Sequence, residues 1–352
     1  MSYESGLIRL HGERITVVSS ELTRRGEPKM DGTPSKIDYA RIRYEWAGNL
    51  HNDTVTFDNA LYVHERVNRL GPSDFLVDVC DGRLGPNPVL KPVEPRKGCN
   101  VTARIASIVP PRGGYVPMSL VKETVTDGGV ITVPPTLRSD VVGQCVQYYS
   151  TFLYTGDVSK ATEVSRMGLV RMTEQQREDY LDLCNRLRTE GDERRWIGIM
   201  YAISSYDELF RSGRFPHGPA DPDISDDEAD ILSEASKRTV AFMARHPVTD
   251  IEVCFPGAYT DCICKGDADV LCRDRLWDIK VSKYPPTRDN LLQVLVYYLM
   301  GMHSNERPKY TDVQGIGIYN PLLGREYTVD LSSISEKVLD EVRTKVIGYP
   351  GD

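Results

Sequence analysis

Short runs of branched and aromatic residues alternate with clusters of glycine and proline along the first third of the chain. This pattern is typical of strands separated by turns. The predicted strands are residues 7–19, 39–46, 54–63, 75–79 and 101–108. A proline-rich stretch at 82–97 indicates a long surface loop, and residues 126–135 are typical of a hairpin that leads to a domain boundary.

Helical spacing of apolar residues dominates the rest of the chain. The predicted helices are residues 141–154, 173–188, 194–210 and 225–245, and a highly apolar helix is predicted at 290–301. Strands are predicted at 261–271, 275–281 and 315–319. We therefore expect an α/β protein with a β-rich accessory domain of unknown role at 1–134. A second domain at 135–352 is expected to have its core at about 225–335, as a mixed central sheet flanked by helices.

Two aspartates fall on the neighbouring strands 261–271 and 275–281. Asp269 closes the first strand and Asp278 lies in the second, across a short polar turn. Because side chains alternate along a strand, Asp278 and Lys280 point to the same face. Two acids and an amine are therefore expected to share one site.

Two carboxylates that lie close together repel each other unless a cation neutralises them. Oxygen ligands from Asp269 and Asp278, with water and the backbone carbonyl of Ile279, suit Mg²⁺ or Mn²⁺. Such an ion activates water and stabilises charge on a phosphate under attack, and Lys280 can orient the water or offset that charge. The pattern indicates phosphate chemistry.

In order and spacing these residues resemble the PD-(D/E)xK nuclease superfamily, and within it the RecB-like branch. The matching motifs are Gly266 to Asp269, Asp278 to Lys280, and Gln293 to Tyr297, which cover roughly a third of the chain together with the strand that follows. The resemblance implies a restriction-endonuclease-like core with Asp269 and Asp278 as metal ligands, Lys280 as the catalytic lysine and Gln293 as a supporting residue.

The superfamily usually supplies a further acidic residue or a histidine from a helix before the first core strand. The candidate helix is 225–245, where Glu228 lies near the middle of the apolar stripe and Glu234 lies outside it. Glu228 is thus the candidate fourth catalytic and metal-binding residue. Ser225 and Glu228 also have the spacing of a capping box, which explains the glutamate without catalysis. His246 is the weaker substitute.

Gln293 lies inside an apolar helix and therefore needs a hydrogen-bond partner. This partner is either a group in the polar site or a nearby backbone carbonyl. Tyr297 is expected in the core or at the rim. Four cysteines, Cys254, Cys262, Cys264 and Cys272, crowd the same region. Their spacing differs from zinc knuckles, and we interpret them as small buried hydrophobes and reduced thiols. The cysteines that hold an iron–sulfur cluster in some RecB-like nucleases have no counterpart after Cys272.

The net charge of −8 and the pI near 5.4 argue against a large basic surface for nucleic acid. A local groove remains possible because basic residues surround the proposed site, namely Arg273, Arg275, Lys280, Lys283, Arg288 and Lys309. No membrane span or signal peptide is recognisable, so a cytoplasmic protein is expected.

The expected function is metal-dependent hydrolysis of phosphodiesters. The resemblance implies DNA rather than RNA as the substrate, and a role in either defence or repair. The alternative is a catalytically silent module that binds nucleic acid or protein. The N-terminal domain could also serve a protein partner or an oligomer.

Overall fold

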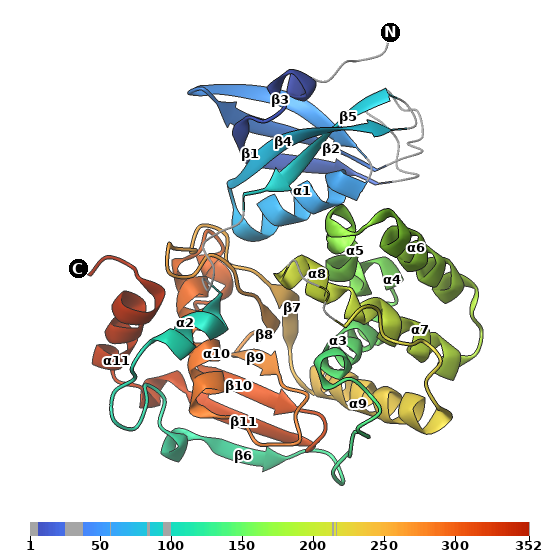
Figure 1. The fold of residues 1–352 in the computed structure, drawn as a ribbon. Coiled ribbons are helices and arrows are strands. Elements are labelled where there is room, and N and C mark those ends of the chain that lie inside the picture. Colours follow the sequence, from blue (N-terminus) through green and yellow to red (C-terminus); the bar gives the residue numbers. More distant parts are fainter. Residues whose placement is uncertain are drawn as a thin grey trace. The chain divides into compact units, whose positions relative to one another are not determined.

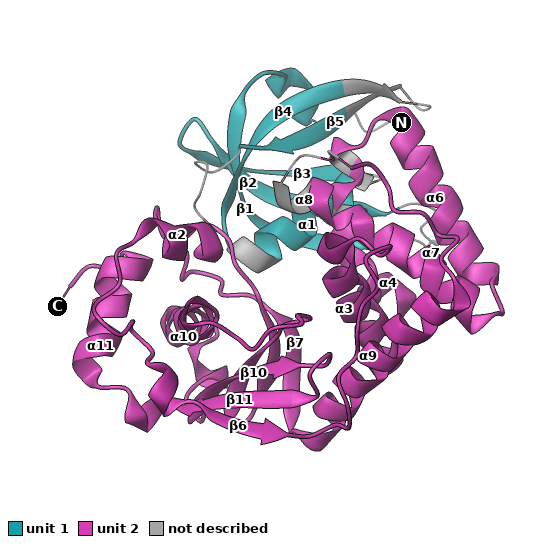
Figure 2. Cartoon of the chain, turned by 60° about the horizontal axis from the view of Figure 1, so that its bottom comes forward, with its two compact units in different colours: residues 1–97 teal, residues 98–352 magenta. Residues whose placement is uncertain are grey.

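The computed structural model describes residues 6–24, 38–56, 58–82, 85–93, 100–212, 215 and 217–351. The chain divides into two compact units, Met1–Lys97 and Gly98–Asp352 (Figure 2). The boundary thus precedes the expected position near residue 134. Residues 122–125 form no part of an N-terminal domain, because they pair as strand β6 with strand β11 of the second unit.

The first unit contains a five-stranded antiparallel sheet in the order β3-β2-β1-β4-β5 (Figure 1). A short 3₁₀ helix, Gly6–Leu10, comes before the first strand. The strands are β1 Arg14–Thr23, β2 Tyr39–Trp46, β3 Asn49–Thr56, β4 Ser73–Gly82 and β5 Gly85–Pro92. Helix α1, Asp58–Leu70, packs against β1. The β-rich character predicted for this region is confirmed.

Three local predictions in and after this unit are wrong. The run 54–63 is divided between β3 and α1, because Ala60, Val63 and Val67 form the buried stripe of a helix. Strand β5 occupies half of the region predicted as a long loop. The run 101–108 forms helix α2, Val101–Ser107, which Asn100 caps by accepting a 2.7 Å hydrogen bond from the backbone N–H of Ala103.

A six-stranded mixed sheet forms the centre of the second unit, in the order β6-β11-β10-β9-β8-β7. Strands β9 and β10 are parallel, and all other neighbours are antiparallel. The strands are β6 Lys122–Val125, β7 Val248–Val253, β8 Ala268–Cys272, β9 Arg275–Ile279, β10 Gly315–Asn320 and β11 Arg325–Asp330. The predicted strand 261–271 is shorter than expected, since β8 begins only at Ala268. The predicted hairpin at 126–135 contains no further strand.

Helices cover both faces of this sheet (Figure 1). On one face, helix α10, Arg288–His303, packs with α2 over Leu271, Leu276 and Ile316. On the other, helix α9, Asp226–Arg245, places Phe242 against Trp277 and Tyr319. The remaining α-helices are α3 Ser139–Thr155, α4 Val158–Ala161, α5 Glu163–Met167, α6 Glu174–Thr189, α7 Glu193–Ser205, α8 Asp207–Ser212 and α11 Glu336–Glu341. The mixed α/β class expected from the sequence is confirmed.

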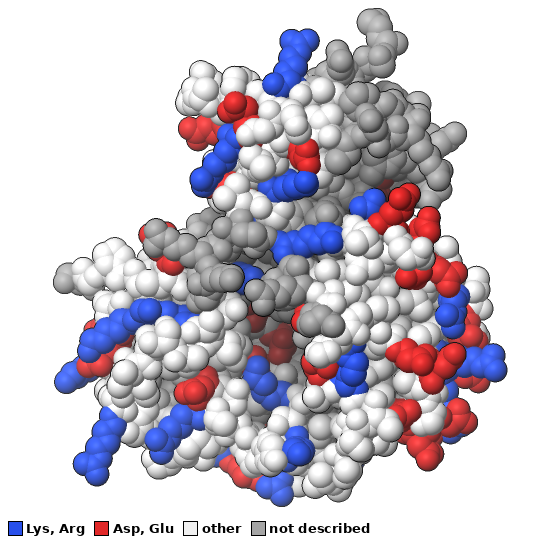
Figure 3. Space-filling view, viewed as in Figure 1, with Lys and Arg blue, Asp and Glu red and all other residues white. Residues whose placement is uncertain are grey.

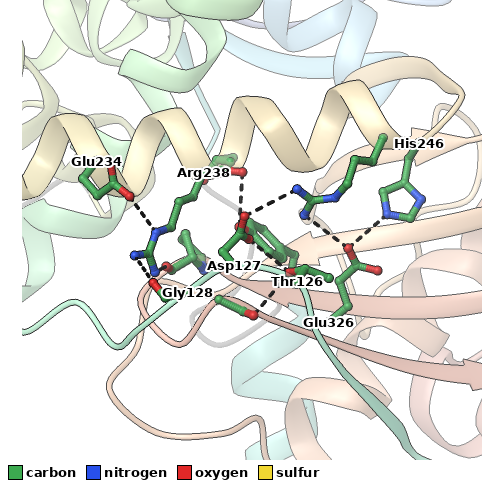
Figure 4. Close-up of polar contacts among 12 residues, drawn as sticks. Thr126, Asp127, Gly128, Glu234, Arg238, His246 and Glu326 are labelled. Carbon is green, nitrogen blue, oxygen red and sulfur yellow. Dashed lines mark hydrogen bonds and ion pairs between the residues drawn. The ribbon is translucent and has the colours of Figure 1, made fainter.

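A polar network joins α9 to the segment that follows β6 (Figure 4). The hydroxyl of Tyr319 donates to Asp127 over 2.7 Å, and Arg245 lies 3.5 Å from the same carboxylate. Arg238 donates to the backbone carbonyl of Gly128 over 2.7 Å. Burial would raise the pKa of Asp127, but the hydrogen bonds and the charge of Arg245 outweigh it and lower this pKa. The ionised network therefore fixes α9 against the sheet.

The parallel pair β9 and β10 requires a close approach at Gly317. A Cβ atom at this position would lie 2.3 Å from the ring of Trp277, the residue paired with it across the strands. Glycine is therefore the residue that lets the indole lie flat on the neighbouring strand. Among the described residues, no helix is both long and apolar enough to cross a lipid bilayer.

Candidate active site

Asp269 and Asp278 lie opposite each other at one end of the pair β8 and β9. The antiparallel register pairs Val270 with Trp277 and Leu271 with Leu276, so one further step places the two aspartates face to face. The backbone N–H of Ile279 donates a 2.5 Å hydrogen bond to Asp269. Strand geometry thus brings the two carboxylates together, as the sequence predicted.

Lys280 provides the positive charge of the site. Its Nζ lies 2.9 Å from Oδ2 of Asp278, whose side chain is only 4% exposed. No other donor within the described residues reaches that oxygen. The backbone N–H of Lys280 donates to the carbonyl of Tyr319 over 2.9 Å, which fixes the start of the loop after β9 to strand β10. The ammonium is therefore held against a buried carboxylate.

The two aspartates ionise with difficulty together. Burial, followed by the charge of Asp278, raises the pKa of Asp269 from 3.8 to about 8. Burial also raises the pKa of Asp278, although the adjacent Lys280 opposes it. Burial alone would lower the pKa of Lys280, but both carboxylates outweigh this effect and raise it. At neutral pH, Asp269 therefore keeps its proton, while Asp278 is paired with the ammonium of Lys280.

A cavity of about 260 Å³ opens onto these groups. Figure 3 shows Asp and Glu atoms recessed in a hollow of the second unit, with Lys and Arg atoms near its margin. The residues that line the cavity are Gly143, Gln144, Gln147, Asp267, Asp269, Asp278, Ile279, Lys280, Val281, Gln293 and Tyr297. One wall therefore comes from α3, a helix to which the sequence assigned no role in the site.

Gln144 is the informative residue of this wall. Its side-chain oxygen is buried and has no hydrogen-bond partner among the described residues. A buried amide oxygen without a partner is costly, so this oxygen is available to water or to a ligand in the polar cavity. Gln144 and Gln147 lie among the apolar residues Val141 to Tyr149 of this helix, as Gln293 does in α10, and this signal was available in the sequence.

Helix α10 supplies the opposite wall. The side-chain amide of Gln293 donates a 2.9 Å hydrogen bond to the hydroxyl of Tyr297, one turn further along. Tyr297 packs against Gly266, where a Cβ atom would lie 3.0 Å from its ring. The partner of Gln293 is thus a side chain of the same helix. The glycine of the first motif allows that helix to approach the aspartate strand.

Glu228 does not line the cavity. It completes a capping box with Ser225, whose backbone N–H donates to the carboxylate over 2.8 Å, and it accepts a further hydrogen bond from Thr136. The hydrogen bonds from Thr136 and Ser225 lower its pKa. The capping interpretation is confirmed, and these contacts account for the carboxylate without a metal.

His246 also lies away from the cavity. It contacts the ring of Trp277, which points to the sheet face opposite Asp278, and its Nε2 lies 3.3 Å from Glu326 (Figure 4).

The basic residues expected around the site have different environments. Arg275 binds the backbone carbonyls of Ile316 and Val329, and Lys309 pairs with Asp250 at the surface. These two side chains are engaged in the fold. In contrast, Lys283 and Arg288 are exposed, and within the described part of the chain they form no ion pair.

One cysteine departs from the expectation of reduced thiols. Cys254, Cys262 and Cys272 are free, whereas Cys264 is disulfide-bonded. The expectation of reduced thiols is therefore wrong for Cys264.

The donor set fits a hard divalent cation. Asp269, Asp278, the carbonyl of Ile279 and the unpartnered oxygen of Gln144 are all oxygen ligands of the kind that Mg²⁺ and Mn²⁺ prefer. Within the described ranges, no three His, Cys, Asp or Glu side chains converge into a metal-binding group. Two carboxylates, neutral oxygens and water would therefore complete the coordination shell.

No protein-family model and no curated protein matches this chain.

Proposed function

We propose that the second unit is a metal-dependent phosphodiester hydrolase with a restriction-endonuclease-like core, in the RecB-like branch of the PD-(D/E)xK superfamily. The observation that carries this proposal is the convergence of Asp269, Asp278 and Lys280 on one cavity, where the carboxylates outnumber the ammonium. DNA is the preferred substrate by resemblance.

The charged residues have separate roles in the proposed reaction. Asp269 and Asp278 would hold Mg²⁺ or Mn²⁺, together with the carbonyl of Ile279. When bound, the ion would supply a water of lowered pKa and positive charge at the phosphate. Lys280 holds its ammonium next to Asp278, where it can orient the attacking water or offset the charge that develops on the phosphate oxygens. Gln293 orders the wall behind them through Tyr297.

Helix α3, and not α9, would supply the additional oxygen ligand that we expected from Glu228. Gln144 offers a neutral oxygen where the resemblance led us to expect an acid or a histidine, so it would complete the shell without a further negative charge. Asp267 also lines the cavity, so a divalent ion and the ammonium would together balance three carboxylates and leave no excess negative charge to repel a phosphate. Glu228 has no role in this proposal.

Cleavage of linear, circular and single-stranded DNA with Mn²⁺ or Mg²⁺ tests the proposal. We expect the wild-type chain to cut in metal and not in EDTA, and Lys280→Ala to lose at least about 10²-fold in rate. Lys309→Ala is the matched control, because it removes a surface ammonium paired with Asp250. Intact DNA in every wild-type reaction, or equal rates in both variants, would contradict the proposal.

A further inference from the structure

The loop between β9 and α10 connects the strand that carries Asp278 to the helix that carries Gln293. Lys280 and Val281, at its start, line the cavity, and α10 carries Gln293 beyond its end. Between them, Tyr284 is 64% exposed. A single exposed aromatic residue is common at protein surfaces, so its surroundings must decide whether it has a function.

The backbone at Tyr284 is fixed, although its ring is open to solvent. The side-chain amide of the fully buried Asn320 donates to the carbonyl of Ser282 over 2.7 Å and to that of Tyr284 over 3.2 Å. The backbone N–H of Tyr284 donates to the hydroxyl of Ser282, and Pro285 and Pro286 follow. A ring on a rigid backbone loses little conformational entropy when it binds a flat ligand.

Basic residues without an ion pair among the described residues lie on this loop and on the segment next to it. Lys283 lies with Nζ 5.1 Å from the ring centroid of Tyr284. Arg288 begins α10 four residues later, and a Cβ atom at Gly114 would lie 3.2 Å from its Cδ, so the loop that carries the exposed Arg112 is its neighbour. No ion pair involves these three basic residues within the described ranges. In a chain with a net charge of −8, these cations provide a local positive surface.

An exposed aromatic ring among cations has the chemistry of a platform for single-stranded nucleic acid, in which bases stack on the ring and phosphates meet the basic residues. A duplex keeps its base faces stacked inside and cannot use such a ring without unpairing. Tyr284 lies four residues from Lys280, hence at most about 14 Å along the chain. A strand whose phosphate occupies the cavity can therefore reach the ring with a nearby base.

We infer that the loop 282–288 is a docking platform for single-stranded nucleic acid and that Tyr284 is its base-stacking residue. The inference rests on the proposed function, because it assigns the substrate class of the same site. Tyr284 acts as a positioning and specificity residue, distinct from the groups that would hold the metal.

Fluorescence anisotropy tests this inference with the full chain and a labelled oligothymidylate of about 15 nucleotides, in Ca²⁺ to prevent cleavage. We expect Tyr284→Ala to weaken binding roughly 5- to 100-fold, the range that base–aromatic stacking spans, and Tyr284→Phe to restore it. Binding of a blunt duplex hairpin should not change. Tyr154→Ala is the matched control, because Tyr154 is also exposed and lies outside the cavity lining.

Equal affinity of Tyr284→Ala and wild type for the oligonucleotide would overturn the inference, as would equal losses for single strand and duplex. Cleavage assays with Mn²⁺ on the same preparations separate the two proposals. A wild-type chain that cuts DNA while Tyr284→Ala binds normally would overturn the inference alone. Selective loss of single-strand binding in a chain that never cuts would overturn the proposed hydrolase and support the platform.

Discussion

Replacing Asp269 by asparagine should stabilise the metal-free protein, and increasingly so as the pH rises. The folded protein holds the pKa of Asp269 at about 8, whereas the ordinary value is 3.8. Between these values the folded state keeps a proton that the unfolded state has lost, so raising the pH favours unfolding. Asparagine carries no such charge and can still accept the hydrogen bond from Ile279.

The size of the effect follows from the proton linkage. One proton corresponds to about 1.4 kcal/mol per pH unit, so the difference can change by at most about 3 kcal/mol between pH 6 and pH 8. Because the side chain of Asp269 is only half-buried, water reduces this figure, and we expect roughly 2 kcal/mol. Above pH 8 the difference between the variants should level off, since Asp269 then ionises in both states.

Guanidinium unfolding in EDTA at pH 6, 7 and 8 measures this difference for wild type and Asp269→Asn. Asp330→Asn is the control, because Lys122 and Arg275 lower the pKa of that carboxyl and it stays ionised throughout this range. A stability difference between wild type and Asp269→Asn that is the same at all three pH values would refute the reasoning. It would mean that the two aspartates ionise together without conflict.

Three further predictions follow from the site and the sheet. Mg²⁺ or Mn²⁺ at 100 times its Kd should stabilise wild type by about 2.7 kcal/mol, and Asp278→Asn should abolish the gain, as thermal unfolding with and without metal will show. Gln144→Glu should bind Mn²⁺ more tightly than wild type in calorimetry, because a carboxylate replaces the unpartnered amide oxygen; weaker binding would exclude Gln144 from the coordination shell. Gly317→Ala should lose about 1–3 kcal/mol of unfolding free energy in urea, because the new methyl group meets the ring of Trp277, and an unchanged midpoint would contradict this packing.

Much of the second unit could be predicted from local patterns. Strand β10 and helices α9 and α10 begin and end close to the predicted residues, because apolar spacing agrees with capping residues such as Ser225 and Thr287. The adjacency of Asp269 and Asp278 followed from two short strands joined by a tight turn. In these segments local preference and tertiary packing act in the same direction.

Other features depend on contacts that are distant in the sequence. Residues 101–108 have the composition of a strand, yet Asn100 caps them into helix α2. Gln144 lines the same cavity as Asp269 and Asp278, which are more than 100 residues away in the sequence, and no local periodicity reveals this proximity. The pairing of β6 with β11 joins residues that are about 200 positions apart, and it moves the domain boundary towards the N-terminus. For Glu228, the cap and the ligand give the same sequence pattern, and only the position of the cavity distinguishes them.

The most direct test of the central claim compares Lys280 and Glu228, two charged residues that the sequence offered as catalytic candidates. Rates of Mn²⁺-dependent DNA cleavage should fall at least about 10²-fold in Lys280→Ala and stay within about twofold of wild type in Glu228→Ala. The account predicts this contrast because Lys280 contacts a buried carboxylate in the cavity, whereas Glu228 caps α9 outside it. Full activity in Lys280→Ala, or equal loss in both variants, would contradict it.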